Sequence, residues 1–228
     1  MSVATPRTDL PPLIVGYVKR NLLSGDTASR VRFAQVGEMQ LKPGKWARFE
    51  AEQEVSVQRV EFSWRARFPL APLVALHVRD WYLAGEGALE VRLWGLPLKR
   101  QRGDAVAKGE AIRYLAELPW APQAMIDNRE LEWREFDERT VEVATSIGGE
   151  RVAVLLHFDA TGDIVGASAE ERPRAVGKTA VATPFAGEFG DYEVFGGVRV
   201  PTKAEVRWDL PDGPFVYFRG RLTELAVE

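Results

Sequence analysis

Apolar and polar residues alternate along most of this chain with the period of two that a β-strand requires. In the segment VEFSWRARF, residues 60–68, every second side chain is apolar and the side chains between them are polar or charged. This alternation is typical of a strand with one buried and one solvated face. It returns in several other segments, at residues 89–93, 141–147, 152–158 and 206–210.

Short turn-forming runs separate these strands: KPGK, AGEG, IGGE, ATGD, FGG and PDG. Turn signals at such short intervals favour a meander of antiparallel strands. About ten strands are indicated, and a sheet of that size must curl or close on itself. No linker rich in proline, glycine or serine divides the 228 residues. We therefore expect a single domain at 1–228, with the sheet at about 29–228.

Two segments break the period of two. Apolar residues recur at helical spacing after a proline pair near the N-terminus, which predicts an amphipathic helix at about residues 11–23. The second segment, about 109–126, contains EAIRYLAELPW, and its helix must end near Pro119. A curled sheet has a hollow that such short helices can fill. We predict an α+β, mainly β fold: one strongly curved antiparallel sheet, a half-barrel, with short central helices in its concave face and an N-terminal helix.

Net charge and cysteine content exclude several functional classes. The formal net charge is −3, which supplies no general attraction for phosphate backbones, so we expect no nucleic-acid partner. The chain has no cysteine, which excludes disulfides and thiolate nucleophiles. The N-terminal apolar run is about six residues long, too short for a membrane span, and lacks the marks of a signal peptide. We expect a cytoplasmic protein, and no oligomeric state is indicated.

Several apparent motifs have a simpler structural interpretation. The segment VGKTA, residues 176–180, shares Gly-Lys-Thr with phosphate-binding loops, but Arg172 stands where the first glycine is required. His77 and His157 lie in predicted strands without metal-ligand spacing. We expect neither a cofactor nor a metal site, and no catalytic residue is indicated.

Asp80 is the most informative charged residue, because strict alternation places it on the apolar face of its strand with Val78 and Tyr82. A buried carboxylate needs a partner or loses its charge. We predict Arg113 as that partner, in a polar network that includes Glu117 and Arg172. Such a network either locks the helices into the sheet or anchors a ligand's polar end, and both interpretations stay open.

Arg113, Glu117 and Trp120 recur at helical spacing, so they share one stripe of the predicted central helix. We expect that stripe to face the interior, where a charged pair and an aromatic wall can coexist. Aromatic residues of the strands would face the same interior, as a dense core or as a pocket for an apolar molecule. The predicted ligand-binding residues are Trp64, Tyr82, Arg113, Glu117, Trp120, Trp133 and Trp208.

Several motifs together resemble an uncharacterised bacterial family of unknown function. They are DWYLAGEG (80–87), RYLAELPWAP (113–122, an RYLAE-x-x-W-x-P motif), Trp133, FDATGDI (158–164), Arg172, TPFAGEFGDY (183–192), GGVRVPTKAEVRW (196–208) and Tyr217. The resemblance implies a fold similar to the periplasmic lipoprotein carriers, whose curved antiparallel sheet holds short helices. Phe185 stands where relatives are expected to have tryptophan, and we expect this chain to differ from many relatives in lacking a membrane anchor or signal.

The leading functional hypothesis is non-enzymatic binding of a hydrophobic or amphipathic, lipid-like small molecule in the concave cavity. Arg113 and Asp80 would then hold its polar end. One alternative is a hydrolase-type enzyme that uses Asp80 or Glu117 as acid and base. Another is a structural or protein-interaction domain whose sheet edge or aromatic patch contacts another protein.

Overall fold

The computed structural model describes residues 9–23, 28–177 and 179–228, and within them 13 strands form one antiparallel sheet. The strands are β1 (Arg30–Lys42), β2 (Lys45–Ser56), β3 (Phe62–Ala71), β4 (Val74–Leu83), β5 (Glu86–Leu93), β6 (Leu96–Arg102), β7 (Glu132–Asp137), β8 (Thr140–Ile147), β9 (Glu150–Phe158), β10 (Ile164–Val176), β11 (Thr179–Phe195), β12 (Val198–Leu210) and β13 (Gly213–Val227). The helices are α1 (Pro12–Asn21), α2 (Asp104–Ala116), the 3₁₀ turn η1 (Leu118–Trp120) and α3 (Pro122–Asp127).

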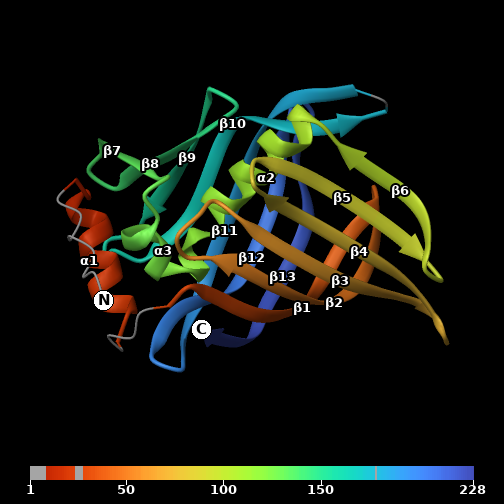
Figure 1. The fold of residues 1–228 in the computed structure, drawn as a ribbon, viewed down its shortest axis with the longest axis horizontal. Helices are drawn as coiled ribbons and strands as arrows, with labels where there is room; N and C mark the ends of the chain where they lie inside the picture. Colours follow the sequence, from red (N-terminus) through yellow and green to blue (C-terminus); the bar gives the residue numbers. More distant parts are fainter. Residues whose placement is uncertain (1–8, 24–27, 178) are drawn as a thin grey trace.

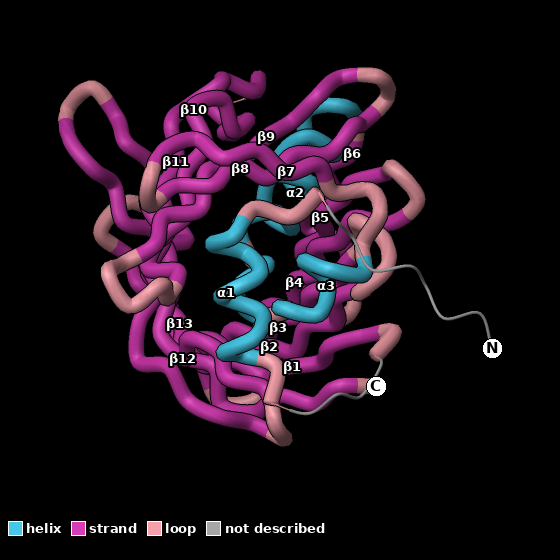
Figure 2. Tube along the Cα trace, turned by 90° about the vertical axis from the view of Figure 1, so that its left-hand side faces the viewer, coloured by secondary structure: helices cyan, strands magenta, loops and turns pink. Residues whose placement is uncertain are grey.

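Neighbouring strands in the sheet are neighbours in sequence, with one exception. The first strand pairs with the last, so that Val31 lies opposite Val227 at the centre of the sheet. The two edges are β6 and β7, and the segment α2-η1-α3 connects one edge to the other. Figures 1 and 2 show the sheet curled around this segment without closing. The predicted curved, unclosed antiparallel sheet with central helices is confirmed.

The number of strands and the bounds of two helices differ from the sequence prediction. The sheet has 13 strands rather than about ten, in part because the edge strands β6 and β7 are exposed along nearly all of their length and show no alternation. The central helix begins at Asp104 rather than near 109, directly after Gly103 with φ 108°. The carboxylate of Asp104 lies in the first turn, where its negative charge interacts favourably with the positive end of the helix dipole. The N-terminal helix covers Pro12–Asn21, slightly less than expected.

An aromatic cluster fills the middle of the concave face. The ring of Phe49 lies 5.4 Å from Phe218, 5.6 Å from Phe68 and 5.9 Å from Trp64, measured between centroids. A Cβ atom on Gly37 would lie 2.1 Å from the carbonyl oxygen of Arg219 in β13 and 2.9 Å from the tip of the Phe49 ring. The missing side chain at Gly37 therefore makes room for this ring against the backbone of β1.

Gly87 allows α2 to lie directly on the sheet. A Cβ atom at this position of β5 would stand 2.6 Å from Ala107 Cα, which is closer than real side chains approach. Because Ala107 is itself small and buried, helix and strand backbones meet without an intervening side chain. This contact fixes the first half of α2 against the β5 side of the hollow.

The helices α1 and α3 occupy the end of the hollow that faces the viewer in Figure 2. Tyr17 of α1 donates a hydrogen bond to the carbonyl oxygen of Pro119 at 3.2 Å. Arg199 of β12 donates to both carboxylate oxygens of Asp163 at 2.7 Å and to Asn21 at 3.0 Å. These contacts attach α1 to the sheet and to η1. In the described part of the chain, no helix is long and apolar enough to cross a membrane.

The Gly87 contact leads to a prediction. Gly87→Ala should lower the free energy of unfolding by about 1–3 kcal/mol, the usual cost of overpacking a close contact. The matched control is Gly190→Ala on β11, because a Cβ atom there meets nothing within 4 Å. Urea unfolding of both variants measures the difference. Equal stability of the two variants would contradict direct contact between α2 and β5.

Candidate functional site

Arg113 is the centre of a buried polar network between α2 and the sheet. Its Nη1 donates to Asp80 Oδ2 at 2.6 Å, its Nε to Glu117 Oε1 at 2.8 Å and its Nη2 to Gln53 Oε1 at 3.1 Å. Gln53 Nε2 donates to Glu117 Oε2 at 2.5 Å, which closes the ring of contacts. The sequence grouped Asp80, Arg113 and Glu117, and the structure brings these three side chains together.

Strand alternation and helix spacing explain why these groups meet. Asp80 of β4 and Gln53 of β2 both occupy inward positions on otherwise apolar stripes. Arg113 and Glu117 are four residues apart on one face of the helical segment. The guanidinium carbon of Arg113 also lies 4.9 Å from the Phe62 ring centre and 5.1 Å from that of Trp64. Apolar rings therefore surround the charge from the sheet side.

The carboxylates of the network hold Arg113 in its charged form. Burial alone would lower the pKa of Arg113, but the carboxylates of Glu117 and Asp80 outweigh it and raise that pKa. The side chains of Arg113 and Asp80 are only 15% and 9% exposed, so little solvent screens their attraction. Removing either partner would leave an uncompensated buried charge.

Glu110 is a fifth member of this network, and the sequence analysis missed it. Burial raises the pKa of its carboxyl well above the usual range, and the neighbouring Asp80 carboxylate raises it further. Burial also raises the pKa of Asp80, but Arg113 opposes this effect. We assign the proton to Glu110 for that reason. Among the described residues, Asp80 Oδ1 and Glu110 Oε2 have no other hydrogen-bond partner, and one proton between the two carboxyls supplies the missing donor.

Arg172 lies beside this network rather than in it. Its Nη1 donates to the hydroxyl oxygen of Tyr217 at 3.0 Å, and its guanidinium carbon lies 4.6 Å from the Phe185 ring centre and 5.4 Å from that of Trp208. Trp208 stacks on Tyr217 at 5.6 Å. No carboxylate of the described residues forms an ion pair with Arg172, although its field lowers the pKa of Asp80 and Glu110.

A cavity of about 470 Å³, here called the end cavity, opens between the edge strand β6 and strands β10–β12 across α2. Its lining includes Leu89, Arg100, Arg102, Val106, Glu110, Arg172 and Trp208. Figure 1 shows this region where β6 and the β10–β11 hairpin approach each other over α2. Glu110 and Arg172 connect the cavity with the buried network.

The aromatic residues of the predicted ligand site have different surroundings. Trp64 is buried and donates through Nε1 to Gln35 at 3.1 Å, and Trp120 is buried and donates to the carbonyl of Pro201 at 2.8 Å. Trp133 packs against the core from a half-buried position. Tyr82 borders a separate surface hollow near Glu130. Of the predicted set, Trp208 alone borders the end cavity in the described structure.

The remaining candidate motifs occupy structural positions. Gly177 lies between β10 and β11 at a hairpin turn, and Lys178 lies outside the described residues. His157 Nε2 is 2.8 Å from Ser168 Oγ on the neighbouring strand. His77 lies on the outer face of the sheet, opposite Arg92.

Sequence patterns could have identified Glu110 and Gln53 as members of the network. Glu110 precedes Arg113 by three residues, which places both on the same side of a helix. Gln53 interrupts the apolar stripe formed by Phe49, Ala51 and Val55 in β2. A polar side chain on a buried stripe needs partners, and Gln53 finds them in Arg113 and Glu117.

Sequence comparison assigns the family. A family model described as a family of unknown function, DUF6544, matches residues 4–220. The chain belongs to the DUF6544 family. No curated protein matches the chain. The expected membership in a family of unknown function is confirmed, and the RYLAE-x-x-W-x-P motif as its signature stays a prediction.

Solved structures show a similar fold. A DUF1329 family protein from Desulfovibrio piger aligns over 96% of this chain and 94% of its own, with a TM-score of 0.50 and 14% identity. A LolA superfamily protein from Nitrosomonas europaea gives 0.47 and 10%, over 95% and 92% of the two chains. A putative outer membrane lipoprotein-sorting protein domain from Vibrio parahaemolyticus gives 0.48 and 7%, over 95% and 91%. At 14% identity, the similarity to the DUF1329 family protein concerns the fold alone.

The assignment of the proton to Glu110 leads to a prediction. An acid whose pKa is raised by folding stabilises the fold below its unfolded pKa of about 4.3, and this contribution is lost as the pH rises through the folded pKa. Glutamine cannot lose that proton and can donate to Asp80. Glu110→Gln should therefore gain stability relative to the unsubstituted protein between about pH 5 and about pH 8.

Urea unfolding at both pH values measures this gain. Glu135→Gln on the exposed strand β7 is the control, and its stability difference from the unsubstituted protein should not depend on pH in this way. A Glu110→Gln variant whose relative stability stays constant with pH would show that Glu110 is ionised in the folded protein.

Proposed function

We propose that this protein binds an anionic amphipathic small molecule of lipid-like character in the end cavity, without chemical conversion. The cavity volume of about 470 Å³ lies within the range of small-molecule sites. The proposal keeps the ligand class expected from the sequence. It moves the polar end of the ligand from Arg113 to Arg172.

The proposal depends on the surroundings of the Arg172 guanidinium group. Its guanidinium group is oriented by the Tyr217 hydroxyl and by two aromatic rings, yet it has no ion-pair partner among the described residues. A guanidinium group has five N–H donors in a rigid plane, suited to a carboxylate or phosphate. The donors that Tyr217 leaves free are therefore available to an anionic head group.

Arg113 cannot take this role in the same conformation. Its Nη1, Nε and Nη2 atoms all donate to protein oxygens, and its side chain is 15% exposed. A ligand head group at Arg113 would have to displace Asp80, Glu117 or Gln53. The network thus acts as a structural anchor, and its neighbour Arg172 remains free to bind.

The walls of the end cavity suit the two ends of an amphipathic molecule. Leu89 of β5 and Val106 of α2 offer apolar surface, and Trp208 offers an aromatic face. Arg100 and Arg102 of β6 add positive charge to the lining, although Arg100 also pairs with Glu90. An apolar chain can lie against α2 while its anionic end meets Arg172.

One observation supports the enzymatic alternative. Glu110 borders the end cavity and shares a proton with Asp80, and paired carboxyls of this kind serve as acid and base in many enzymes. Glu117, which the sequence suggested for this role, is bound to Arg113 and Gln53 instead. Conversion of a bound ester into acid and alcohol would favour a hydrolase over a binding protein.

The binding proposal predicts a charge-selective effect of Arg172→Gln. The variant should bind a dansyl-labelled fatty acid about tenfold more weakly, because one charged hydrogen-bonding partner is lost. Binding of the matched fatty alcohol should not change. Fluorescence titration measures both affinities, and native mass spectrometry of the protein from its own host identifies any co-purified molecule.

Arg174→Gln is the matched control, because Arg174 lies two residues along the same strand and does not border the end cavity. Its affinities should equal those of the unsubstituted protein. Equal loss of acid and alcohol binding in Arg172→Gln would assign Arg172 a structural role. Failure of the unsubstituted protein to bind either probe would contradict the proposed ligand class.

A further inference from the structure

Two neighbouring hairpins end in exposed apolar residues. Leu73, in the turn between β3 and β4, is 97% exposed, and Trp94, in the turn between β5 and β6, is 70% exposed. Large apolar side chains rarely gather in solvent without a partner. The tip surface consists of these two residues together with the exposed residues Leu70, Leu96 and Leu98.

Both turns carry a bulky residue where the backbone favours glycine. Trp94 has φ 50° and Leu73 has φ 62°, in the left-handed region that L-residues avoid. Trp94 is the first of two turn residues, a position held in other hairpins by Ala84, Gly148, Gly177 and Gly196. Leu73 is the second turn residue, and after Pro43 that position is held by Gly44. Local folding alone therefore does not explain the choice of tryptophan and leucine at these tips.

The two tips lie side by side at one end of the sheet. The strands β4 and β5 pair with Leu76 opposite Leu93, so their outer ends are level to within a few residues. Figure 1 shows the β3–β4 and β5–β6 hairpins extending to the same right-hand end of the molecule. The tip surface is thus one surface and not two separate side chains.

The same hairpins are basic, although the whole chain has a net charge of −3. Residues 65–102 contain seven lysines and arginines against three aspartates and glutamates. On the outer face of β3 and β4, Arg65 lies opposite Arg79, and Arg67 lies opposite His77. On their other sides, Arg65 and Arg67 lie opposite Glu52 and Glu50 of β2, and Arg79 lies opposite Glu90 of β5.

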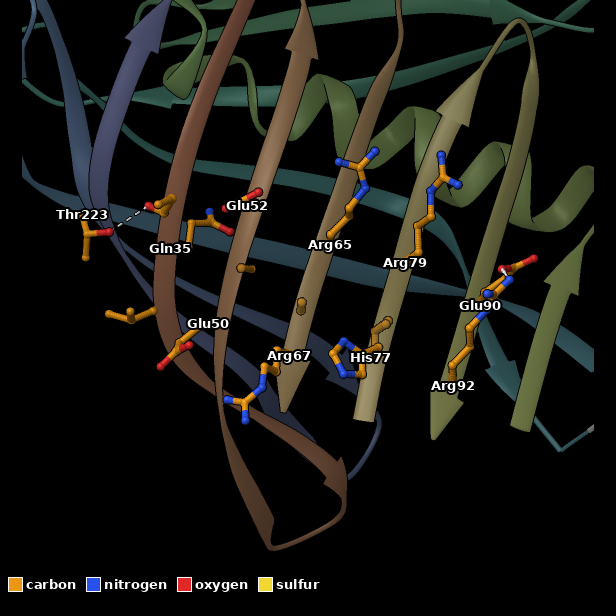
Figure 3. A pocket seen from close by; sticks show the side chains of 15 residues that line it. Gln35, Glu50, Glu52, Arg65, Arg67, His77, Arg79, Glu90, Arg92 and Thr223 are labelled. Atoms are coloured by element: carbon orange, nitrogen blue, oxygen red, sulfur yellow. Dashed lines mark hydrogen bonds and ion pairs between the residues drawn. The ribbon is translucent and has the colours of Figure 1, made fainter. Parts of the chain in front are cut away.

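Figure 3 shows these side chains along a shallow groove of about 520 Å³, here called the outer groove. Glu50 and Glu52 border it on β2, and Glu90 borders it on β5. Glu90 already pairs with Arg92 and Arg100. Within the described chain, Arg65, Arg67 and Arg79 form no ion pair, so their charges are available to an anionic partner.

We propose that the β3–β4 and β5–β6 hairpins dock on an anionic lipid surface. The tip surface would enter the boundary between head groups and acyl chains, where tryptophan is favoured. The guanidinium groups behind it would face lipid phosphates, since apolar and basic residues act together in surface binding. This charge complementarity selects a lipid surface as the partner. The inference does not depend on a ligand in the end cavity.

The test uses vesicles of phosphatidylcholine, with and without phosphatidylglycerol. The unsubstituted protein should co-sediment with the mixed vesicles and bind pure phosphatidylcholine more weakly. The double variant Leu73→Gly/Trp94→Gly should bind mixed vesicles at least about tenfold more weakly, because its apolar tips are lost. Its melting temperature should stay equal or rise, since glycine accepts positive φ.

Ala84→Gly is the matched control, because Ala84 has φ 51° in a similar turn at the opposite end of β4. It should relieve the backbone and leave vesicle binding unchanged. Arg65→Gln/Arg79→Gln should weaken binding to the mixed vesicles and leave the weak binding to phosphatidylcholine unchanged. This second variant separates the contribution of charge from that of the apolar tips.

Three outcomes would overturn the inference. The first is equal vesicle binding by the unsubstituted protein and the Leu73→Gly/Trp94→Gly variant, and the second is no binding by either. The third is self-association of the unsubstituted protein, abolished by the double glycine variant, without vesicle binding. That result would assign the tip surface to a second copy of this chain.

Discussion

The ion pair between Arg113 and Asp80 is the interaction on which the interior depends. It joins a helix that crosses the hollow to a strand of the curved sheet, at a place where solvent screens the charges little. Gln53 and Glu117 complete the hydrogen bonds of the guanidinium group, and Phe62 and Trp64 surround it with apolar rings. A single cation thereby fixes the position of α2 relative to β2, β3 and β4.

Filling the hollow in this manner determines where a ligand can bind. Aromatic residues and three short helical elements occupy most of the concave face, and the space between β6 and β10–β12 remains at one end. Glu110 extends the network from Asp80 to that space, and Arg172 lies across from it on an aromatic wall. The structural network and the proposed ligand site are therefore adjacent but separate, because every guanidinium nitrogen of Arg113 donates to a protein oxygen, whereas only Nη1 of Arg172 does so among the described residues.

The sequence was sufficient for those features that local patterns determine. Alternation in β4 identified Asp80 as an inward carboxylate, and helical spacing identified Arg113 and Glu117 as neighbours. Edge strands such as β6 were missed because solvent on both faces removes the alternation. The side chains around Arg172 could not be predicted from the sequence either, because the pairing of β10 with β11 shifts register between Ala169 and Arg172. A bulge changes which face a side chain occupies, and local patterns do not encode how far the sheet curls.

A double-mutant cycle on Asp80 and Arg113 measures whether this ion pair holds α2 in the sheet. The free energies of unfolding of Asp80→Asn, Arg113→Met and the double variant, compared with that of the unsubstituted protein, give the coupling between the two side chains. A coupling of about 2 kcal/mol or more is expected for a buried, hydrogen-bonded ion pair. A coupling below about 0.5 kcal/mol, as for independent sites, would show that this pair does not hold the central helix in the sheet.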